Sequence, residues 1–274
     1  MPMTINTNLV SMNAQRNSDA SQMSLATSMQ RLSSGLRVNS AKDDAAGSGI
    51  ASRMNAQIKG MNVAVRNAND AISLSQTAEG ALGKVGDMLQ RMRELAVQSA
   101  NATNSAADRT SLDAEYQQLG AEIGRTLTST KFNGIAILAG SAGAQAFQVG
   151  ANNGDTVTVT TTDMSANATI TAVTGGGVTT VAASNTALTN IDTALGTVNS
   201  ERALYGAAQN RFDSIVATRQ VSAENQAAAR SRIMDADFAS ETANLSRAQI
   251  LQQAGTAMIA QANQLPQQVL TLLR

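Results

Sequence analysis

Apolar side chains recur every three or four residues over two unusually long segments of this sequence. Leu82, Val85, Leu89, Met92 and Ala96 follow one another at spacings of 3, 4, 3 and 4. This spacing places side chains on one face of an α-helix, and it predicts one continuous helix over residues 44–99. Helices of ordinary globular domains are far shorter, so such a helix indicates packing in a bundle or coiled coil.

A second segment keeps the same alternation for more than four heptads. Its members are Leu188, Ile191, Leu195, Val198, Arg202, Tyr205, Gln209, Phe212, Val216 and Arg219. The polar members of this series are expected to set the register of the helix or to face a partner.

Three further helices are predicted. Residues 4–36 form one, with its apolar side made by Ile5, Leu9, Met12, Met23, Leu25, Met29, Leu32 and Leu36. A third helix follows a break at residues 101–108 and ends near residue 129. The last helix carries Leu251, Gly255, Met258, Ala262, Leu265, Val269 and Leu272 at spacings of 4, 3, 4, 3, 4 and 3, and Pro266 is expected to bend it.

Two breaks interrupt the helical pattern, at residues 31–47 and at residues 231–238. In the first, Ser40-x-x-Asp43 is interpreted as a capping box, with Asp43 and Asp44 in the first turn of the next helix. The chain is therefore expected to leave and re-enter one helical body at two matching points.

The middle of the chain loses the helical period. A turn is predicted at Asn133-Gly134, and residues 146–149 and 156–160 are predicted as two strands joined by a turn. Weak strands are also predicted at 168–173 and 178–182, and this Ser- and Thr-rich piece is expected to face solvent. The fold class that follows is mainly α: a long antiparallel helical bundle formed by the two halves of the chain, with a small insert of β-hairpins.

Composition excludes several classes of function. The chain has no His and no Cys, so His- and Cys-based catalytic arrangements and ordinary zinc sites are excluded. We therefore expect no enzyme, cofactor or metal, and attribute Asp43-Asp44 to a helix start and Asn152–Asp155 to a hairpin turn. Lys and Arg total 20 and Asp and Glu total 20, a balance that argues against nucleic acid and permits self-association. No apolar run is long enough to span a membrane, and the N-terminus lacks the pattern of a cleaved signal peptide.

Three sequence blocks resemble bacterial flagellin: RLSSGLRVNSAKDDAAG at residues 31–47, LQRMRELAVQSAN at residues 89–101 and SRAQILQQAGTAMIAQANQLPQQVLTLLR at residues 246–274. The INTN sequence at residues 5–8 agrees with them. The resemblance covers roughly residues 1–160 and 186–274 and is weak between them.

This resemblance implies a structural subunit that polymerises into the flagellar filament for swimming motility and is exported without cleavage. It implies an extracellular location on the bacterial flagellum, many identical copies as partners, and an export chaperone, a cap and hook-junction proteins as further partners. It also implies three zones: residues 1–40 and 236–274 as an inner coiled coil, 41–145 and 184–235 as a surrounding helical domain, and 146–183 as a reduced, exposed, β-rich outer region. The alternatives are the junction protein between hook and filament, and a secreted coiled-coil adhesin.

Two sets of site residues are expected. The polymerisation interface comprises Leu9, Met29, Leu32, Leu36, Leu251, Met258, Leu265, Val269 and Leu272. The resemblance further implies a surface for the flagellin-sensing Toll-like receptor, formed by Arg91, Leu95 and Glu115. A solvated or ion-paired helix face explains the same charged residues without any receptor.

Overall fold

The computed structural model describes residues 7–140 and 143–272, and the surroundings of side chains through residue 264. The chain forms two compact units. The terminal unit contains residues 1–56 and 225–274, and the central unit contains residues 57–224. Two long helices, α2 (Ala45–Ala100) and α5 (Val181–Met234), contribute residues to both units.

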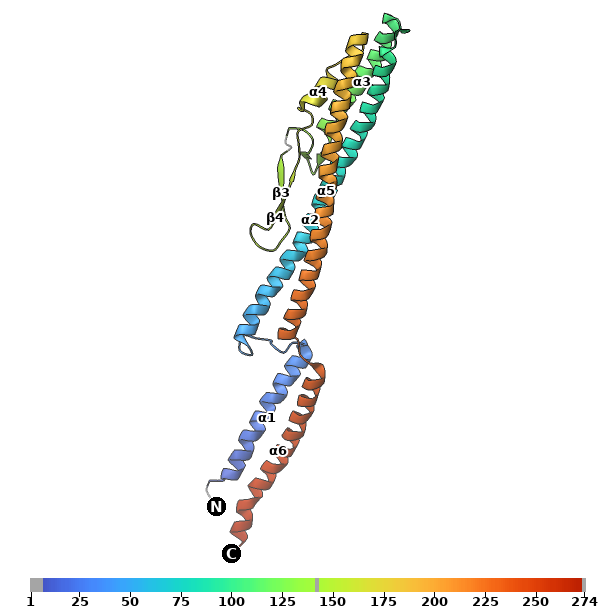
Figure 1. Ribbon diagram of the computed structural model, residues 1–274. Helices are drawn as coiled ribbons and strands as arrows, with labels where there is room; N and C mark the ends of the chain where they lie inside the picture. Colours follow the sequence, from blue (N-terminus) through green and yellow to red (C-terminus); the bar gives the residue numbers. More distant parts are fainter. Residues whose placement is uncertain (1–6, 141–142, 273–274) are drawn as a thin grey trace. The chain divides into compact units, whose positions relative to one another are not determined.

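The terminal unit is built on two helices, α1 (Leu9–Ser34) and α6 (Phe238–Leu272), which lie side by side and antiparallel (Figure 1). The Asn8 side chain caps the start of α1 by accepting a hydrogen bond from the Ser11 N–H. Gly35 ends α1 in the left-handed conformation, with φ at 70°, where a residue without a Cβ is favoured. The helix predicted at residues 4–36 is confirmed over residues 9–34, and residues 7, 8, 35 and 36 lie outside it.

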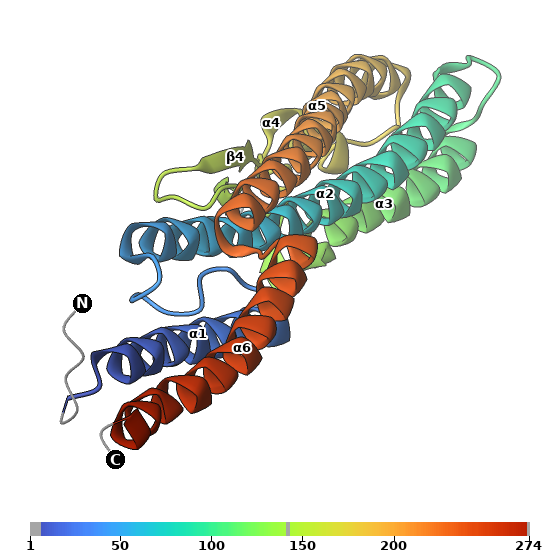
Figure 2. The same ribbon diagram turned by 90° about the horizontal axis from the view of Figure 1, so that it is seen from below.

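Three helices form the body of the central unit: α2, α5 and α3 (Ala106–Ser129). Figure 2 shows α2 lying between α3 and α5. Ser105 starts α3 with a complete capping box, in which its hydroxyl accepts from the Asp108 N–H and the Asp108 carboxylate accepts from Ser105. The long helix predicted at 44–99 and the end predicted near residue 129 are both confirmed.

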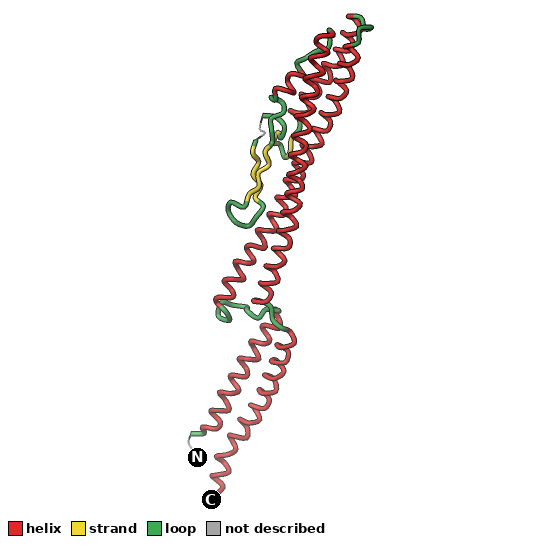
Figure 3. The backbone as a smooth tube through the Cα atoms, in the orientation of Figure 1, coloured by secondary structure: helices red, strands yellow, loops and turns green. Residues whose placement is uncertain are grey.

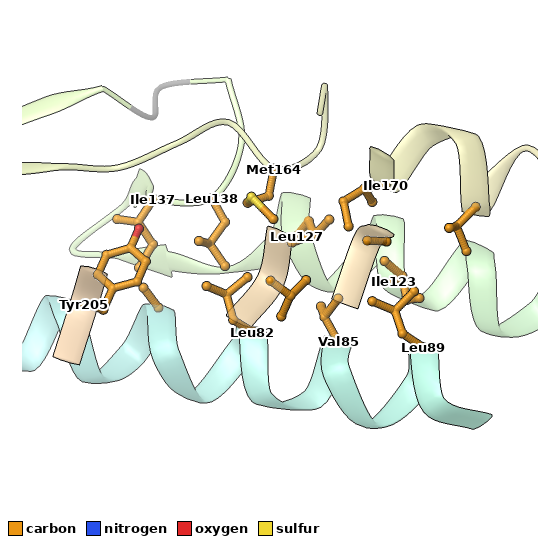
Figure 4. Close-up of a cluster of buried hydrophobic side chains, with 14 of the residues drawn as sticks. Leu82, Val85, Leu89, Ile123, Leu127, Ile137, Leu138, Met164, Ile170 and Tyr205 are labelled. Carbon is orange, nitrogen blue, oxygen red and sulfur yellow. The ribbon is translucent and has the colours of Figure 1, made fainter. Parts of the chain in front are cut away.

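The core of the central unit follows the predicted spacing. Leu82, Val85, Leu89 and Met92 on α2 are fully buried, and the α5 series contributes Ile191, Val198, Tyr205 and Phe212 at intervals of seven. Ile123 and Leu127 of α3 complete the cluster that Figure 4 shows around Leu82 and Val85. Small and aliphatic side chains therefore fill a seam between closely packed helices.

Two short hairpins lie beside these helices (Figure 3). The first pairs β1 (Lys131–Phe132) with β2 (Ile135–Ala136) through the predicted Asn133-Gly134 turn, where both residues have positive φ. The second pairs β3 (Ala144–Gln148) with β4 (Thr156–Thr160) in antiparallel register. Val157 and Val159 of β4 point into the core, and Thr156, Thr158 and Thr160 point to solvent.

The prediction of weak strands at 168–173 and 178–182 is wrong. Residues 168–174 form a short helix, α4 (Ala168–Thr174), and α5 already begins at Val181. The prediction that this piece faces solvent is also wrong for four of its apolar residues, because Met164, Ile170, Val173 and Val178 are at most 2% exposed. The i, i+3 pair Ile170 and Val173 buries one face of α4, and this burial outweighs the weak strand propensity of Thr, Ile and Val.

The capping prediction at the first break is wrong as well. The Ser40 N–H and hydroxyl both donate to the Asp43 carboxylate, at 2.9 and 3.1 Å, in a turn that precedes the helix. The backbone N–H donors of Ser40 and Asn39 lower the pKa of Asp43. The residue that caps α2 is Asp44, whose Oδ1 accepts from the Gly47 N–H at 2.8 Å, one residue before the helix begins.

No helix in the part of the chain that the structure describes is long and apolar enough to cross a membrane.

Candidate functional sites

The seam between α1 and α6 is made of small residues. Ser11, Ser18 and Ser28 are the buried residues of α1, and Ala248 and Ala262 are buried on α6. Gly255 faces Ser18: a Cβ added there would lie 3.6 Å from the Ser18 Cβ. Small side chains at these positions let the two helix backbones approach closely, but they bury little apolar surface.

Polar contacts mark both ends of this seam. The Ser11 hydroxyl donates to the Asn263 Oδ1 at 2.8 Å, and the Asn8 Nδ2 donates to the Ala262 carbonyl at 2.8 Å. At the other end the Arg31 guanidinium lies 3.9 Å from the Glu241 carboxylate. These contacts fix α1 against α6 in one antiparallel register.

Several large apolar side chains of the same two helices lie outside the seam. Leu9 is 66% exposed, Met29 58%, Leu251 52% and Met258 60%. An open, mostly apolar groove of about 610 Å³ runs between the helices, and Leu9, Leu251 and Met258 line it. Monomeric proteins rarely leave contiguous apolar patches of this kind uncovered.

The nine residues expected at the polymerisation interface therefore fall into three groups. Leu9, Met29, Leu251 and Met258 are exposed on the paired helices, whereas Leu32 and Leu36 are half-buried within the terminal unit. The remaining three, whose side chains lie outside the described residues, are Leu265, Val269 and Leu272.

Sequence reasoning missed two exposed apolar residues and the composition of the seam itself. Val10 and Ile250 are 52% and 66% exposed on the same pair. The available signal was a second heptad series on α1, because Ser11, Ala14, Ser18, Ser21, Leu25, Ser28 and Leu32 are spaced 3, 4, 3, 4, 3 and 4. A series of serines carries no hydrophobic contrast, so a search for apolar stripes passes over it.

The second candidate site lies on α2 and α3. Arg91 donates to both Glu94 (2.7 Å) and Glu115 (2.9 Å), and all three side chains are about half exposed or more. The hydrogen bonds with Glu94 and then Glu115 raise the pKa of Arg91 above its ordinary value. The structure thus brings Arg91 and Glu115 together on one exposed surface.

Leu95 does not share that surface. Its side chain is only 1% exposed and belongs to the core cluster of the central unit. The expectation that Leu95 contributes to a contact surface is therefore wrong. Its side chain packs in the core beneath α2 and is not accessible to a partner.

The three polar members of the α5 series, Arg202, Gln209 and Arg219, contact other segments of the same chain. The Glu79 carboxylate of α2 lies 3.7 Å from the Arg202 guanidinium, and it accepts a hydrogen bond from the Gln209 side-chain amide at 3.0 Å. Arg219 donates through Nε to the Val149 carbonyl at 2.7 Å and so holds the loop of the second hairpin.

Among the described residues, no group of three or more His, Cys, Asp or Glu side chains is arranged to hold a metal ion.

Comparisons with known proteins agree with this architecture. Residues 5–143 match the family model for the bacterial flagellin N-terminal helical region, and residues 188–273 match the model for the C-terminal helical region. A flagellin of Halalkalibacterium halodurans is 46% identical over 272 residues, covering 99% of this chain and all of that protein. A flagellin of Xenorhabdus nematophila is 42% identical over 313 residues, with both chains fully covered.

Solved structures give the same result for the fold. The crystal structure of Bacillus cereus flagellin is 38% identical, covers 56% of this chain and 88% of that chain, and superposes with a TM-score of 0.51. The structure of a putative flagellar hook-associated protein from Vibrio parahaemolyticus is 15% identical, covers 70% of this chain and all of that chain, and has a TM-score of 0.59, which is a similarity of fold alone. Both terminal family models, the full-length relatives and the paired long helices lead to one conclusion: the chain belongs to the bacterial flagellin family and is a structural subunit of the flagellar filament.

Proposed function

We propose that the chain polymerises through the outward apolar side chains of the α1–α6 pair. The observation that carries this proposal is the exposure of Leu9, Met29, Leu251 and Met258 on two helices whose mutual seam is already occupied by small residues. These side chains have no place inside the terminal unit, so neighbouring copies are the partners that can cover them. Leu265, Val269 and Leu272 continue the same spacing and are included in the proposed interface.

The free energy available from such burial is substantial. Complete burial of one large aliphatic side chain is worth about 1.5–3 kcal/mol. Since Leu251 and Met258 are already about half covered, burying the rest of both contributes roughly 1.5–3.5 kcal/mol per subunit. The same contact repeats along a helical polymer, so a small term per copy becomes decisive for assembly.

The three zones expected from the resemblance belong to this proposal. Residues 1–40 and 236–274 form the inner coiled coil, 41–145 and 184–235 surround it, and 146–183 lie outermost. Filaments of this family lie outside the cell, and we propose that this chain reaches that location uncleaved through the flagellar export apparatus. An export chaperone, a cap and hook-junction proteins are its proposed transient partners. The role is structural, and we assign no enzymatic activity to it.

A seeded polymerisation assay tests the interface. Leu251→Asp combined with Met258→Asp should leave the monomer helical, because both positions are exposed in the monomer. Loss of roughly 1.5–3.5 kcal/mol raises the critical concentration for assembly about ten- to several-hundredfold, and unpaired carboxylates at the interface raise it further. Sedimentation of filaments grown on wild-type seeds measures this concentration.

The matched control is Leu204→Asp, at an equally exposed leucine (59%) on α5 in the central unit. It adds the same charge type outside the terminal pair, so its critical concentration should stay close to that of wild type. If the double variant forms filaments at the wild-type concentration, the α1–α6 pair is not the assembly element and the proposal fails.

A second role is favoured by the charged cluster on α2 and α3. We propose that Arg91 and Glu115 contribute to binding by the flagellin-sensing Toll-like receptor; the support is their shared exposed surface at 2.9 Å and the match of residues 89–101 to the family motif. Arg91→Ala should weaken monomer binding in a surface-binding assay, whereas Lys84→Ala, seven residues earlier on the same helix, should not. Equal binding by the wild type and Arg91→Ala at matched helicity would reject this role.

A further inference from the structure

We propose that the exposed methionines of the α1–α6 pair are sites of oxidation by hydroperoxides, and that this oxidation prevents the subunit from joining a filament. The second part of this inference rests on the interface proposed above. The sequence contains 12 methionines, and all except Met1 and Met3 lie within the residues that the structure describes. Burial divides these methionines into an accessible set and a protected set.

The accessible set lies entirely on the paired helices α1 and α6 (Figure 1). Met12, Met23 and Met29 of α1 are 53%, 66% and 58% exposed, and Met258 of α6 is 60% exposed. Every other described methionine is buried or half-buried: Met54, Met61, Met88, Met92, Met164 and Met234. The central unit therefore shields its methionines, whereas the α1–α6 pair leaves its own in contact with water.

The chemistry needs only a thioether and a hydroperoxide. A lone pair of the methionine sulfur attacks the terminal oxygen of the peroxide, an S–O bond forms and the O–O bond breaks. The sulfur is oxidised by two electrons to a sulfoxide. The proton on the transferred oxygen passes to the departing oxygen, which leaves as water or as an alcohol. Because the peroxide must touch the sulfur, the rate at each methionine should follow the exposure of its side chain.

Two of the accessible methionines border the open grooves between α1 and α6. Met258 lines the groove of about 610 Å³ together with Leu9 and Leu251. Met23 lines a second groove of about 510 Å³, which Leu251 also borders. Since Leu251 belongs to both grooves, Met23 and Met258 lie along one continuous stretch of the surface that assembly is proposed to cover.

A sulfoxide at these positions changes the contact between subunits more than it changes the fold. In the unassembled subunit the side chains already contact water, so the added oxygen stays hydrated and the helices remain intact. At an apolar interface the same oxygen loses its water, which is unfavourable unless a hydrogen-bond donor replaces it. Methionine suits such a surface because it packs adaptably, and oxidation removes this advantage by making the side chain polar.

Peptide mapping by mass spectrometry after a short treatment with hydrogen peroxide tests the accessibility. In the unassembled protein, the four exposed methionines should oxidise at least severalfold faster than Met61, Met92 and Met164. In filaments treated in the same way, Met258 should react severalfold more slowly than in the unassembled protein, because a neighbouring copy covers it. Equal rates at exposed and buried methionines, or equal rates at Met258 in the two states, overturn the proposal.

A seeded sedimentation assay tests the effect on assembly. Protein oxidised at the four exposed positions should keep its far-UV circular dichroism, and its critical concentration should rise roughly tenfold or more. Treatment with methionine sulfoxide reductases should restore both the original mass and the original critical concentration. If the oxidised protein assembles at the critical concentration of the untreated protein, the proposal fails.

Leucine variants identify the responsible residues, because leucine has nearly the volume of methionine and no sulfur. The test variant combines four substitutions: Met12→Leu, Met23→Leu, Met29→Leu and Met258→Leu. It should assemble equally well before and after peroxide. The matched control changes the half-buried methionines, Met54→Leu, Met88→Leu and Met234→Leu, and should remain as sensitive to peroxide as the wild type. Loss of assembly after peroxide in the test variant would contradict the assignment.

The double variant Leu251→Asp with Met258→Asp separates this inference from the interface on which it rests. If that variant assembles normally, the proposed interface itself is wrong. If that variant fails to assemble while the oxidised wild-type protein assembles normally, the interface stands and the inference about oxidation is overturned.

Discussion

Truncation of Leu95 to alanine should destabilise the central unit, although the residue belongs to the motif that we propose for receptor binding. The side chain is 1% exposed and lies within the core cluster. Replacing a buried leucine with alanine loses the transfer free energy of the removed carbons and leaves a cavity, which together cost about 2–4 kcal/mol at a well-packed site. For a unit of this size, residues 57–224, this corresponds to a fall in Tm of roughly 5–15 °C.

Urea denaturation followed by far-UV circular dichroism measures the effect of Leu95→Ala. The matched control is Val97→Ala on the same helix, where the side chain is 50% exposed and the expected change is below about 0.5 kcal/mol. If both Leu95→Ala and Val97→Ala unfold at the same urea concentration as the wild type, Leu95 does not lie in the core. A loss of receptor binding in Leu95→Ala should accordingly be interpreted as a change in the fold, and Arg91→Ala is the variant that tests recognition.

Three further outcomes follow from the central unit. Tyr205→Phe should leave stability unchanged or slightly increased, because the buried Tyr205 hydroxyl has no hydrogen-bond partner among the described residues. Tyr116→Phe removes a hydrogen bond to the Val173 carbonyl and should cost about 1 kcal/mol in the same urea assay. The Ser105 hydroxyl and N–H lower the pKa of Asp108, so the stabilisation from this carboxylate is present above its ordinary pKa of 3.8 and is lost as the pH falls through the lower pKa of the folded state. In acid titrations, the difference in stability between the wild type and Asp108→Asn should therefore shrink below about pH 4. A difference that stays constant with pH would contradict this. Replacing residues 163–183 with a Gly/Ser linker should lower the Tm of the central unit sharply, since four fully or nearly fully buried apolar side chains are removed, and an unchanged Tm would show that this segment is not part of the core.

The sequence by itself determined the long helices of this protein and the seam of its central unit. The 3–4 alternation placed α2 within one residue at each end and identified Leu82, Leu89, Ile191 and Val198 as core. It also located the Asn133-Gly134 turn, where the pair of residues suits two consecutive positive φ values. These features are readable because periodicity and turn chemistry are properties of neighbouring residues along the chain.

Only the tertiary structure decided which faces are covered. Leu95 is buried because α2 packs against α3 on one side and α5 on the other. The buried side of α2 is therefore wider than a single stripe of apolar residues. Residues 168–174 form a helix because Ile170 and Val173 lie on one face of it and are buried in the core. Strand propensity does not take such a contact into account. On α1 and α6, serine and alanine occupy the seam while Leu9 and Met258 remain outside. Burial depends on what lies opposite a side chain, and that neighbour comes from a distant part of the chain or from another copy of it.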